Sequence, residues 1–480
     1  MTEQRPRQRS FAPRSRQGCL TCRRRRKRCD QQEPKCGACV RLNLVCEWQE
    51  QRQIVKRTVE PSPREEDSTS PETEAAVTCP NPLRTAIDPW ENLPHDGVAE
   101  AKHLLQYYIE AFVPSISVAT TRSSFYTALY IPMAAQSERM LNAILALSSA
   151  QLARRASDPV RAHHLREVSS RRQAKCLQFL RPRLAPNGMP LKGLPLRDLC
   201  EMVGVTLMLV GLDALNGNKT PDWLVQLQSA RATLDMLYQQ NNMISWEILD
   251  CLRRHFTYYD VMASLMAGVT RSPRAPLQRT LTHAHSPGNG LCIDPLMGIS
   301  DQLCSLVCRI QLVSTPTPAF PHFSKAHFDV LERDIQNWSY ENPLLAPDIE
   351  TPLALDLIAL AEAYRKAALI QLYRTSEVHR LLIPALASQV MQCISRIPLG
   401  SPAESSLLYP MFLAGAELTT EKDIAMCFER LTAIQKRNRY ENIANLRDVL
   451  QEIWTDVLNG LPKRDWEDVL RELGWSFSLA

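Results

Sequence analysis

The chain contains 480 residues, of which 45% are hydrophobic and 22% are charged, and its formal net charge is only +5. This length supports a large core with more than one helical subdomain. The apolar run 202–212 is too short to span a bilayer, and the basic N-terminal segment has no apolar signal-peptide core. We therefore expect neither a membrane protein nor a secreted one.

The charge is distributed unevenly along the chain. Residues 1–60 contain 16 Lys and Arg against 6 Asp and Glu, whereas residues 61–100 contain 2 against 9. Residues 101–480 are almost balanced, with 38 against 36. A cationic head of this kind is typical of a nucleic-acid-binding protein. We expect residues 1–17 to form a disordered basic arm.

Six cysteines near the N-terminus follow a doubled C-x2-C-x6-C pattern: Cys19, Cys22, Cys29, Cys36, Cys39 and Cys46. Two tetrahedral zinc ions need eight ligand positions, which six thiolates supply only if two of them bridge both metals. Cys19 and Cys36 hold the equivalent first position of each triplet and are the predicted bridging ligands. The sequence thus predicts two Zn²⁺ per chain, held within residues 18–48.

A disulfide framework is the alternative interpretation of these cysteines, since it suits small secreted domains. The other nine cysteines argue against it, because they are scattered through apolar stretches, as expected for reduced intracellular thiols. The doubled spacing is also far more specific for a zinc site than a single C-x2-C pair.

An unbroken basic run, residues 23–28, separates the second cysteine from the third. Six thiolates and two Zn²⁺ carry a combined charge of about −2, so the run compensates the cluster and leaves positive charge for a polyanion. Such a run can also serve as a nuclear-import signal. We expect the protein in the nucleus.

Residues 19–46 resemble the fungal zinc binuclear cluster (Zn2Cys6, C6) domain of fungal transcription factors, through the six cysteines, the basic first arm and the loop 30–35. The resemblance implies two short helices, bridging by the first and fourth cysteines, and recognition of CGG-like, GC-rich half-sites in the major groove of double-stranded DNA. It makes Arg25 and Arg26 the base-contacting residues, and a bidentate Arg–guanine contact suits this role. The residues expected to contact DNA are Arg23, Arg25, Arg26, Lys27, Arg28 and Arg41.

Residues 49–97 are predicted to form a flexible, acidic linker rich in Pro, Ser and Thr. Seven prolines lie between Pro61 and Pro94, and few large apolar residues are present to offset the entropy of ordering. Residues 47–60 show no heptad repeat that would form a dimerising coiled coil. The sequence therefore leaves open a monomer, a homodimer and a heterodimer.

The body of the chain, residues 98–480, is predicted to be all-α. Glycine is scarce, at 16 in 480, and helical periodicity is common. Ser137 is a candidate N-cap for a helix, and residues 353–374 repeat the same apolar spacing. The run 202–212 is interpreted as a buried helix. The predicted fold is thus mostly α, with a small binuclear zinc cluster, a linker and a large all-α C-terminal domain.

The body also resembles the middle homology region of the same transcription factors, the fungal-specific transcription factor domain. The resemblance rests on residues 104–112, 141–149, 362–374 and 410–415, taken together and in this order. It implies an all-α regulatory domain, linked in the family to regulation and sometimes to the response to an effector.

No catalytic constellation is recognisable, since the body has no Gly-rich phosphate loop, nucleophile elbow or HExxH motif. His283 and His285 are interpreted as residues of a solvated loop, with a metal site as the alternative. Cys304 and Cys308 share a helix face and are interpreted as core residues. We do not expect an enzyme.

The C-terminal segment 466–477 mixes acidic and aromatic residues. A terminal helix that docks its Trp and Leu side chains is the favoured interpretation, and a transactivation segment is the alternative.

The function that these patterns favour is zinc-dependent, sequence-specific DNA binding that regulates transcription by RNA polymerase II, with the transcription machinery as a further partner. The alternative is a zinc-stapled module that binds protein or RNA. RNA-binding surfaces usually carry aromatic residues that stack on bases, and the cluster has only Trp48 at its edge. This argues against RNA as the partner.

Overall fold

The computed structural model describes residues 19, 22, 29–32, 35–36, 39, 46, 97–118, 124–184, 193–239, 245–270, 293–294, 297–314, 325–339 and 349–479. They belong to two compact units, residues 1–79 and 80–480, which we describe separately. The predicted basic arm and nearly all of the predicted linker lie outside the described residues, as do His283 and His285.

The second unit is built of helices. Its N-terminal part, here called the first helical group, consists of α4 (Val98–Tyr107), the π-helix η1 (Tyr108–Phe112), α5 (Val113–Ile116), α6 (Phe125–Ala128), α7 (Tyr130–Gln136), α8 (Glu138–Arg155), α9 (Pro159–Leu184), α10 (Leu196–Asn216), α11 (Asp222–Gln239) and α12 (Trp246–Thr270). Within the described residues, extended pairing is limited to one isolated bridge between Ile293 and Ser300. The predicted all-α body is confirmed.

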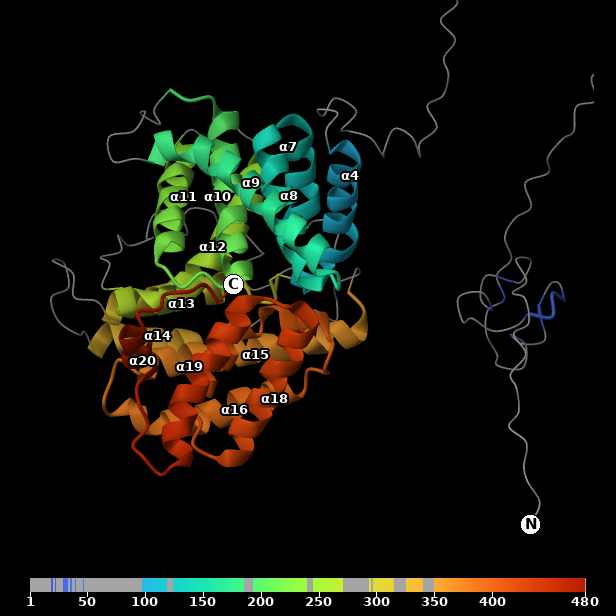
Figure 1. Cartoon of the computed structure of the whole chain (residues 1–480). Coiled ribbons are helices and arrows are strands. Elements are labelled where there is room, and N and C mark those ends of the chain that lie inside the picture. The colour runs from blue at the N-terminus through green and yellow to red at the C-terminus, as the bar shows by residue number, and fades with distance from the viewer. Residues whose placement is uncertain are drawn as a thin grey trace, which may run out of the picture. The chain divides into compact units, whose positions relative to one another are not determined.

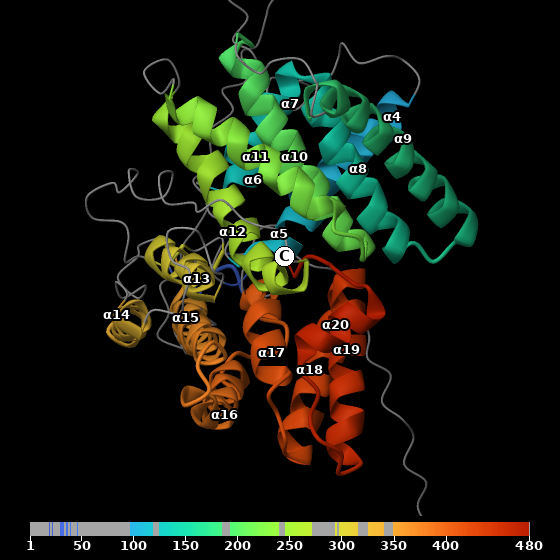
Figure 2. The same cartoon turned by 90° about the vertical axis from the view of Figure 1, so that its left-hand side faces the viewer.

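The remaining helices form the second helical group: α13 (Asp301–Ser314), α14 (Lys325–Gln336), α15 (Thr351–Tyr373), the 3-10 helix η4 (His379–Leu382), α16 (Ile383–Ser395), the 3-10 helix η5 (Pro402–Ser406), α17 (Leu408–Gly415), α18 (Glu421–Asn438), α19 (Glu441–Leu458) and α20 (Trp466–Leu473). Figure 1 shows the first group above the second. Figure 2 shows α17, α18 and α19 side by side. One hydrophobic cluster extends through both groups, so they share a core.

Helix α8 begins where the sequence predicts it. The Ser137 hydroxyl accepts a hydrogen bond from the Met140 N–H at 3.3 Å, which satisfies one of the free donors at the helix start. The apolar face is wider than predicted, because α4, α7, α9 and α10 all pack against α8. Nearly every side chain between Met140 and Gln151 is buried as a result.

The predicted buried helix at 202–212 is the central part of α10. Its side chains are almost all inaccessible to solvent. The helix ends at Gly217, whose φ of 66° and ψ of 34° lie in the left-handed region that glycine favours. A Cβ atom at this position would lie 2.5 Å from the Glu441 Cβ, so a side chain here would collide with the start of α19.

The C-terminal segment docks on the helical core, as the favoured interpretation predicts. Trp466 and Leu470 of α20 are buried, and Phe477 beyond it is fully inaccessible. The Ser476 N–H donates to the Lys219 carbonyl at 2.7 Å, and the Asn442 amide donates to the Ser478 carbonyl at 3.1 Å. The Trp223 indole N–H of α11 also donates to the Ser476 carbonyl at 3.3 Å, so the end of the chain links the start of α11 to α19.

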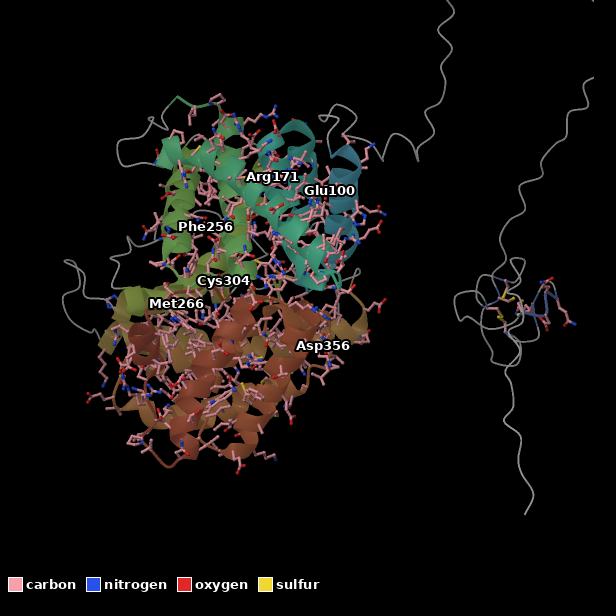
Figure 3. The ribbon with its side chains drawn as sticks, in the orientation of Figure 1. Glu100, Arg171, Phe256, Met266, Cys304 and Asp356 are labelled. Atoms are coloured by element: carbon pink, nitrogen blue, oxygen red, sulfur yellow. The ribbon has the colours of Figure 1, made fainter. Side chains whose placement is uncertain are left out.

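The predicted helix at 353–374 corresponds to α15, which ends with Arg374 as its C-cap. Figure 3 shows Cys304 on α13, where its side chain is fully buried. Cys308 is half-buried, and its thiol lies 3.6 Å from an Asp260 carboxylate oxygen. These positions confirm the interpretation of the two cysteines as core residues.

Candidate zinc centre and nucleic-acid interface

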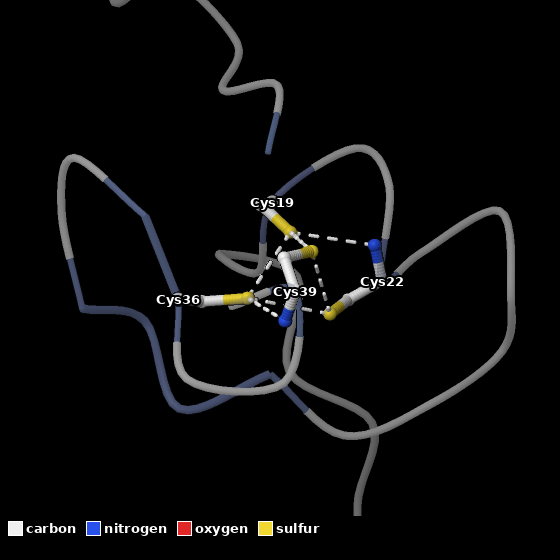
Figure 4. A group of neighbouring side chains, drawn as sticks. All are labelled: Cys19, Cys22, Cys36 and Cys39. Atoms are coloured by element: carbon white, nitrogen blue, oxygen red, sulfur yellow. Dashed lines mark hydrogen bonds between the residues drawn. The ribbon is translucent and has the colours of Figure 1, made fainter. Parts of the chain in front are cut away.

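Four cysteine sulfurs of the first unit form a compact group, drawn in Figure 4. The Cys36 sulfur lies 3.7 Å from that of Cys19 and 3.6 Å from that of Cys22. The Cys39 sulfur lies 3.8 Å and 3.9 Å from the same two atoms. A tetrahedral zinc ion with Zn–S bonds of about 2.3 Å separates its sulfurs by about 3.8 Å. The spacing of this group therefore fits thiolates that share a zinc ion.

The two cysteine triplets fold in the same way. The Cys22 N–H donates to the Cys19 sulfur at 3.3 Å, and the Cys39 N–H donates to the Cys36 sulfur at 3.4 Å. Cys22 and Cys39 both lie in helical backbone. Cys19 and Cys36 consequently hold equivalent places, each with its sulfur facing the N–H three residues later.

A second pair of contacts repeats the equivalence. The Cys19 N–H donates to the Cys29 sulfur at 3.4 Å, and the Cys36 N–H donates to the Cys46 sulfur at 3.3 Å. Hydrogen bonds from backbone N–H groups favour the thiolate form, which is the form that binds metal. Each triplet thus closes on itself through its first and third cysteines.

The thiols crowd one another, and their pKa values diverge. Burial raises the pKa of Cys39 to about 12, and it also raises that of Cys22. Burial acts in the same direction on Cys36, but the Cys39 N–H and the neighbouring thiols hydrogen-bond to it and lower its pKa to about 6. Several thiolates at this spacing repel each other, so a bound cation is needed to stabilise them together.

Asp30 is a candidate ligand that the sequence analysis did not single out. Its carboxylate and the sulfurs of Cys29 and Cys36 all lie within 4.8 Å of one another. The signal in the sequence was its position directly after the third cysteine. An exposed carboxylate is common without a metal, whereas the four grouped thiols are buried.

The predicted DNA-contacting residues, Arg23, Arg25, Arg26, Lys27, Arg28 and Arg41, lie outside the described residues. The basic run joins Cys22 to Cys29, both of which are fixed in the sulfur group or next to it.

Comparison with known families decides the identity of the chain. Residues 103–480 match the family described as the fungal specific transcription factor domain, and residues 17–54 match the fungal Zn(2)-Cys(6) binuclear cluster domain. The chain belongs to this family of fungal transcription factors. It is accordingly a zinc-binding, DNA-binding regulator of transcription, as the resemblance implied.

Individual relatives agree with this assignment. The chain is 21% identical to the transcriptional activator protein UGA3 of Saccharomyces cerevisiae, over 97% of this chain and 98% of that protein. It is 22% identical to an uncharacterized transcriptional regulatory protein of Schizosaccharomyces pombe, over 96% of each. A 35-residue segment is 60% identical to the zinc cluster transcription factor CZF1 of Candida albicans, covering 7% of this chain and 9% of that protein.

No solved structure matches the chain. All three relatives carry names of transcriptional regulators. In the part of the chain that the structure describes, none of the helices combines the length and the apolar character needed to cross a membrane.

Proposed function

We propose that the six cysteines hold two zinc ions, with Cys19 and Cys36 as the ligands that bridge them. One metal would take Cys22 and Cys29, and the other Cys39 and Cys46. The observation that supports this most is the repeated hydrogen-bond pattern, which gives Cys19 and Cys36 equivalent positions in two equivalent triplets.

Such a metal centre would have a structural role. Each metal would have four thiolate ligands and no open position for a substrate. Because a preformed site rarely exists in the unfolded chain, the free energy of metal binding contributes directly to folding of the head. The role of the metals is therefore to hold the basic run in a fixed conformation.

The basic run is the proposed DNA-contacting arm. Arg25 and Arg26 would contact guanines of CGG-like half-sites in the major groove, where a bidentate guanidinium matches the guanine O6 and N7 acceptors. The other members of the predicted set, Arg23, Lys27, Arg28 and Arg41, would contact phosphates, which position the domain without specifying sequence.

In this proposal the protein acts in the nucleus, at promoters of genes that RNA polymerase II transcribes. A single small module gives limited specificity, so a second copy or a different partner would supply the second half-site. The helical unit would then transmit the bound state to the transcription machinery. Because the C-terminal segment is docked on the core, we assign this role to the helical unit as a whole and not to that segment alone.

A selection from random duplex DNA tests the proposal, with the zinc-loaded full-length protein at physiological salt. Paired CGG-like triplets at a fixed spacing are the expected result, and they would also show a dimer. Single triplets would indicate a monomer or a partner of another kind. If zinc is bound and no sequence is enriched, the cluster is instead a zinc-stapled interaction module.

A further inference from the structure

A groove of about 670 Å³ lies in the second unit, between the α8–α9 corner and the α18–α19 corner. Its floor includes the small side chains of Ala153, Ala156 and Ala162, beside Pro159. These side chains leave space that larger residues would fill. The groove is open to solvent and is large enough to seat a small organic molecule.

Four cationic side chains line this groove against a single carboxylate. Arg154 and Arg166 come from the first helical group, Lys436 and Arg439 come from the second, and the carboxylate belongs to Glu441. Arg154 pairs with Glu441, so that carboxylate is already neutralised. The groove therefore has an excess of positive charge, although residues 101–480 as a whole are almost neutral.

Two of the four cations are unpaired within the described part of the protein. Neither Arg166 nor Lys436 has an ion-pair or hydrogen-bond partner among the described residues, and both side chains are exposed. Lys436 lies in the last turn of α18, where a cation complements the helix dipole. Arg166 lies two turns inside α9, near its N-terminal end, where the dipole does not favour a cation. The helix dipole therefore does not explain why an arginine stands at position 166.

Arg439 is held at the groove by an unusual backbone. It is the C-cap of α18, with φ 57° and ψ 34°, a left-handed conformation that costs a non-glycine residue free energy. Its guanidinium donates to the Arg154 backbone carbonyl at 3.0 Å, which fixes it beside the C-terminal end of α8. A glycine would occupy this position without strain, so the arginine side chain has a purpose other than ending the helix.

We propose that this groove binds a small organic polyanion, a molecule that carries two or more phosphate or carboxylate groups on a compact carbon skeleton. The anionic groups would pair with Arg166, Lys436 and Arg439, and the skeleton would lie on the alanine floor. Because the cations come from both helical groups, a bound anion ties α9 to α18. Binding therefore stabilises the arrangement of the two groups. This inference does not depend on how the head recognises DNA.

The test uses the zinc-loaded full-length protein and two probes, inorganic phosphate and succinate. Both are titrated by calorimetry at constant ionic strength, with sodium chloride making up the difference. The groove variant is Arg166→Ala with Lys436→Ala. Its matched control is Arg171→Ala with Arg181→Ala, which removes two exposed cations of α9 outside the groove lining; Arg171 is labelled in Figure 3.

At least one probe is expected to bind the wild type and the control variant equally, and the groove variant at least fivefold more weakly. A preference for phosphate over succinate, or the reverse, assigns the anionic group. The proposal is overturned if neither probe binds the wild type, or if both double variants lose affinity to the same extent.

A second variant keeps the test informative if the groove variant misfolds. Arg439→Gly removes one proposed ligand and relieves the left-handed strain, which offsets the lost hydrogen bond to the Arg154 carbonyl, so it should unfold near the wild-type temperature. Weaker probe binding by this variant supports the groove. If Arg439→Gly and the groove variant both bind the probes with wild-type affinity, the proposal is contradicted.

Discussion

At the scale of single residues, the six cysteines were the most predictable feature of the chain. Their spacing alone predicted a zinc site, and the structure brings four of their sulfurs to 3.6–3.9 Å contacts across the triplets. The candidate ligand Asp30 and the cations Arg166 and Lys436 were missed. The last two are far apart in sequence, and only the folded arrangement of the two helical groups brings them to the lining of one groove.

The first prediction concerns the proposed base readers. Arg25→Ala or Arg26→Ala should reduce discrimination between a CGG-like duplex and a scrambled one by about 1–3 kcal/mol, because a bidentate contact to guanine is lost. Binding titrations on both duplexes, with zinc content measured alongside, check this. Arg41→Ala is the control and should weaken binding to both duplexes alike. Equal losses on both duplexes for Arg25→Ala and Arg26→Ala would remove them as base readers.

The second prediction compares two glycines with the same backbone conformation. Gly217 and Gly474 both have a φ of 66°, but a Cβ at Gly217 would lie 2.5 Å from that of Glu441, whereas nothing lies within 4 Å at Gly474. Gly474→Ala should therefore cost only the left-handed strain, about 1–2 kcal/mol. Gly217→Ala should cost at least about 1 kcal/mol more, because of the added collision. Urea unfolding measures both, and equal costs would show that the collision is relieved.

At the scale of elements, the sequence predicted individual helices better than their surroundings. The Ser137 cap placed the start of α8 correctly, because capping is a local property. The number of buried faces on α8 was not predictable, since it depends on helices that are distant in sequence. The docking of α20 was favoured on its Trp and Leu pattern, but its anchoring by Arg374 was not foreseen.

Arg374 is the centre of a charged network that anchors α20. Its guanidinium contacts Glu417 at 2.9 Å and Asp465 at 2.8 Å, and it lies over the Trp466 ring. Glu417 also pairs with Lys463. Both Arg374 and Glu417 are largely buried, with side-chain exposures of 12% and 7%.

The third prediction is that Arg374→Ala destabilises the helical unit by about 3 kcal/mol at pH 7, because the largely buried Glu417 loses one of its two cationic partners and Asp465 loses its ion pair with Arg374. Arg471→Ala is the control. It breaks an exposed pair with Asp468 and should cost less than about 1 kcal/mol. Urea unfolding followed by tryptophan fluorescence measures both variants. Similar costs for the two would show that the network does not anchor α20.

The fourth prediction follows from the pKa of Asp465. Burial opposes its charge, but the attraction of Arg374 outweighs burial and lowers the pKa of Asp465 below its usual 3.8. A depressed carboxylate pKa stabilises the fold above the unfolded value, and this contribution is lost as pH falls through the folded value. The gap in stability between wild type and Arg374→Ala should therefore narrow below pH 3.8. A gap that stays constant from pH 7 to pH 3 would contradict this assignment.

At the scale of the whole molecule, the chain combines a zinc-binding head with a helical body that has its own extensive core. The sequence predicted this division from its charge distribution and cysteine spacing. It could not predict the shared core of the two helical groups or the C-terminal link between α11 and α19. The contact of α19 with the end of α10, and that of α11 with the end of the chain, join segments separated by more than 200 residues.

The fifth prediction uses this division. Removal of zinc by a chelator should unfold the head and abolish DNA binding, because the metal supplies the folding free energy of such small domains. The far-ultraviolet circular dichroism should change little, since the described helices of the body contain no cluster of thiols like the one in the head. Loss of most helical signal on chelation would mean that the body also depends on metal.

The measurement that tests the central claim most directly is the number of zinc ions bound per folded chain, determined by native mass spectrometry. The four grouped thiols of Cys19, Cys22, Cys36 and Cys39 could by themselves hold one tetrahedral ion. A binuclear cluster with Cys19 and Cys36 as bridges predicts two, reduced when Cys29 or Cys46 is replaced by serine. One zinc per chain, unaffected by those two replacements, would contradict the account.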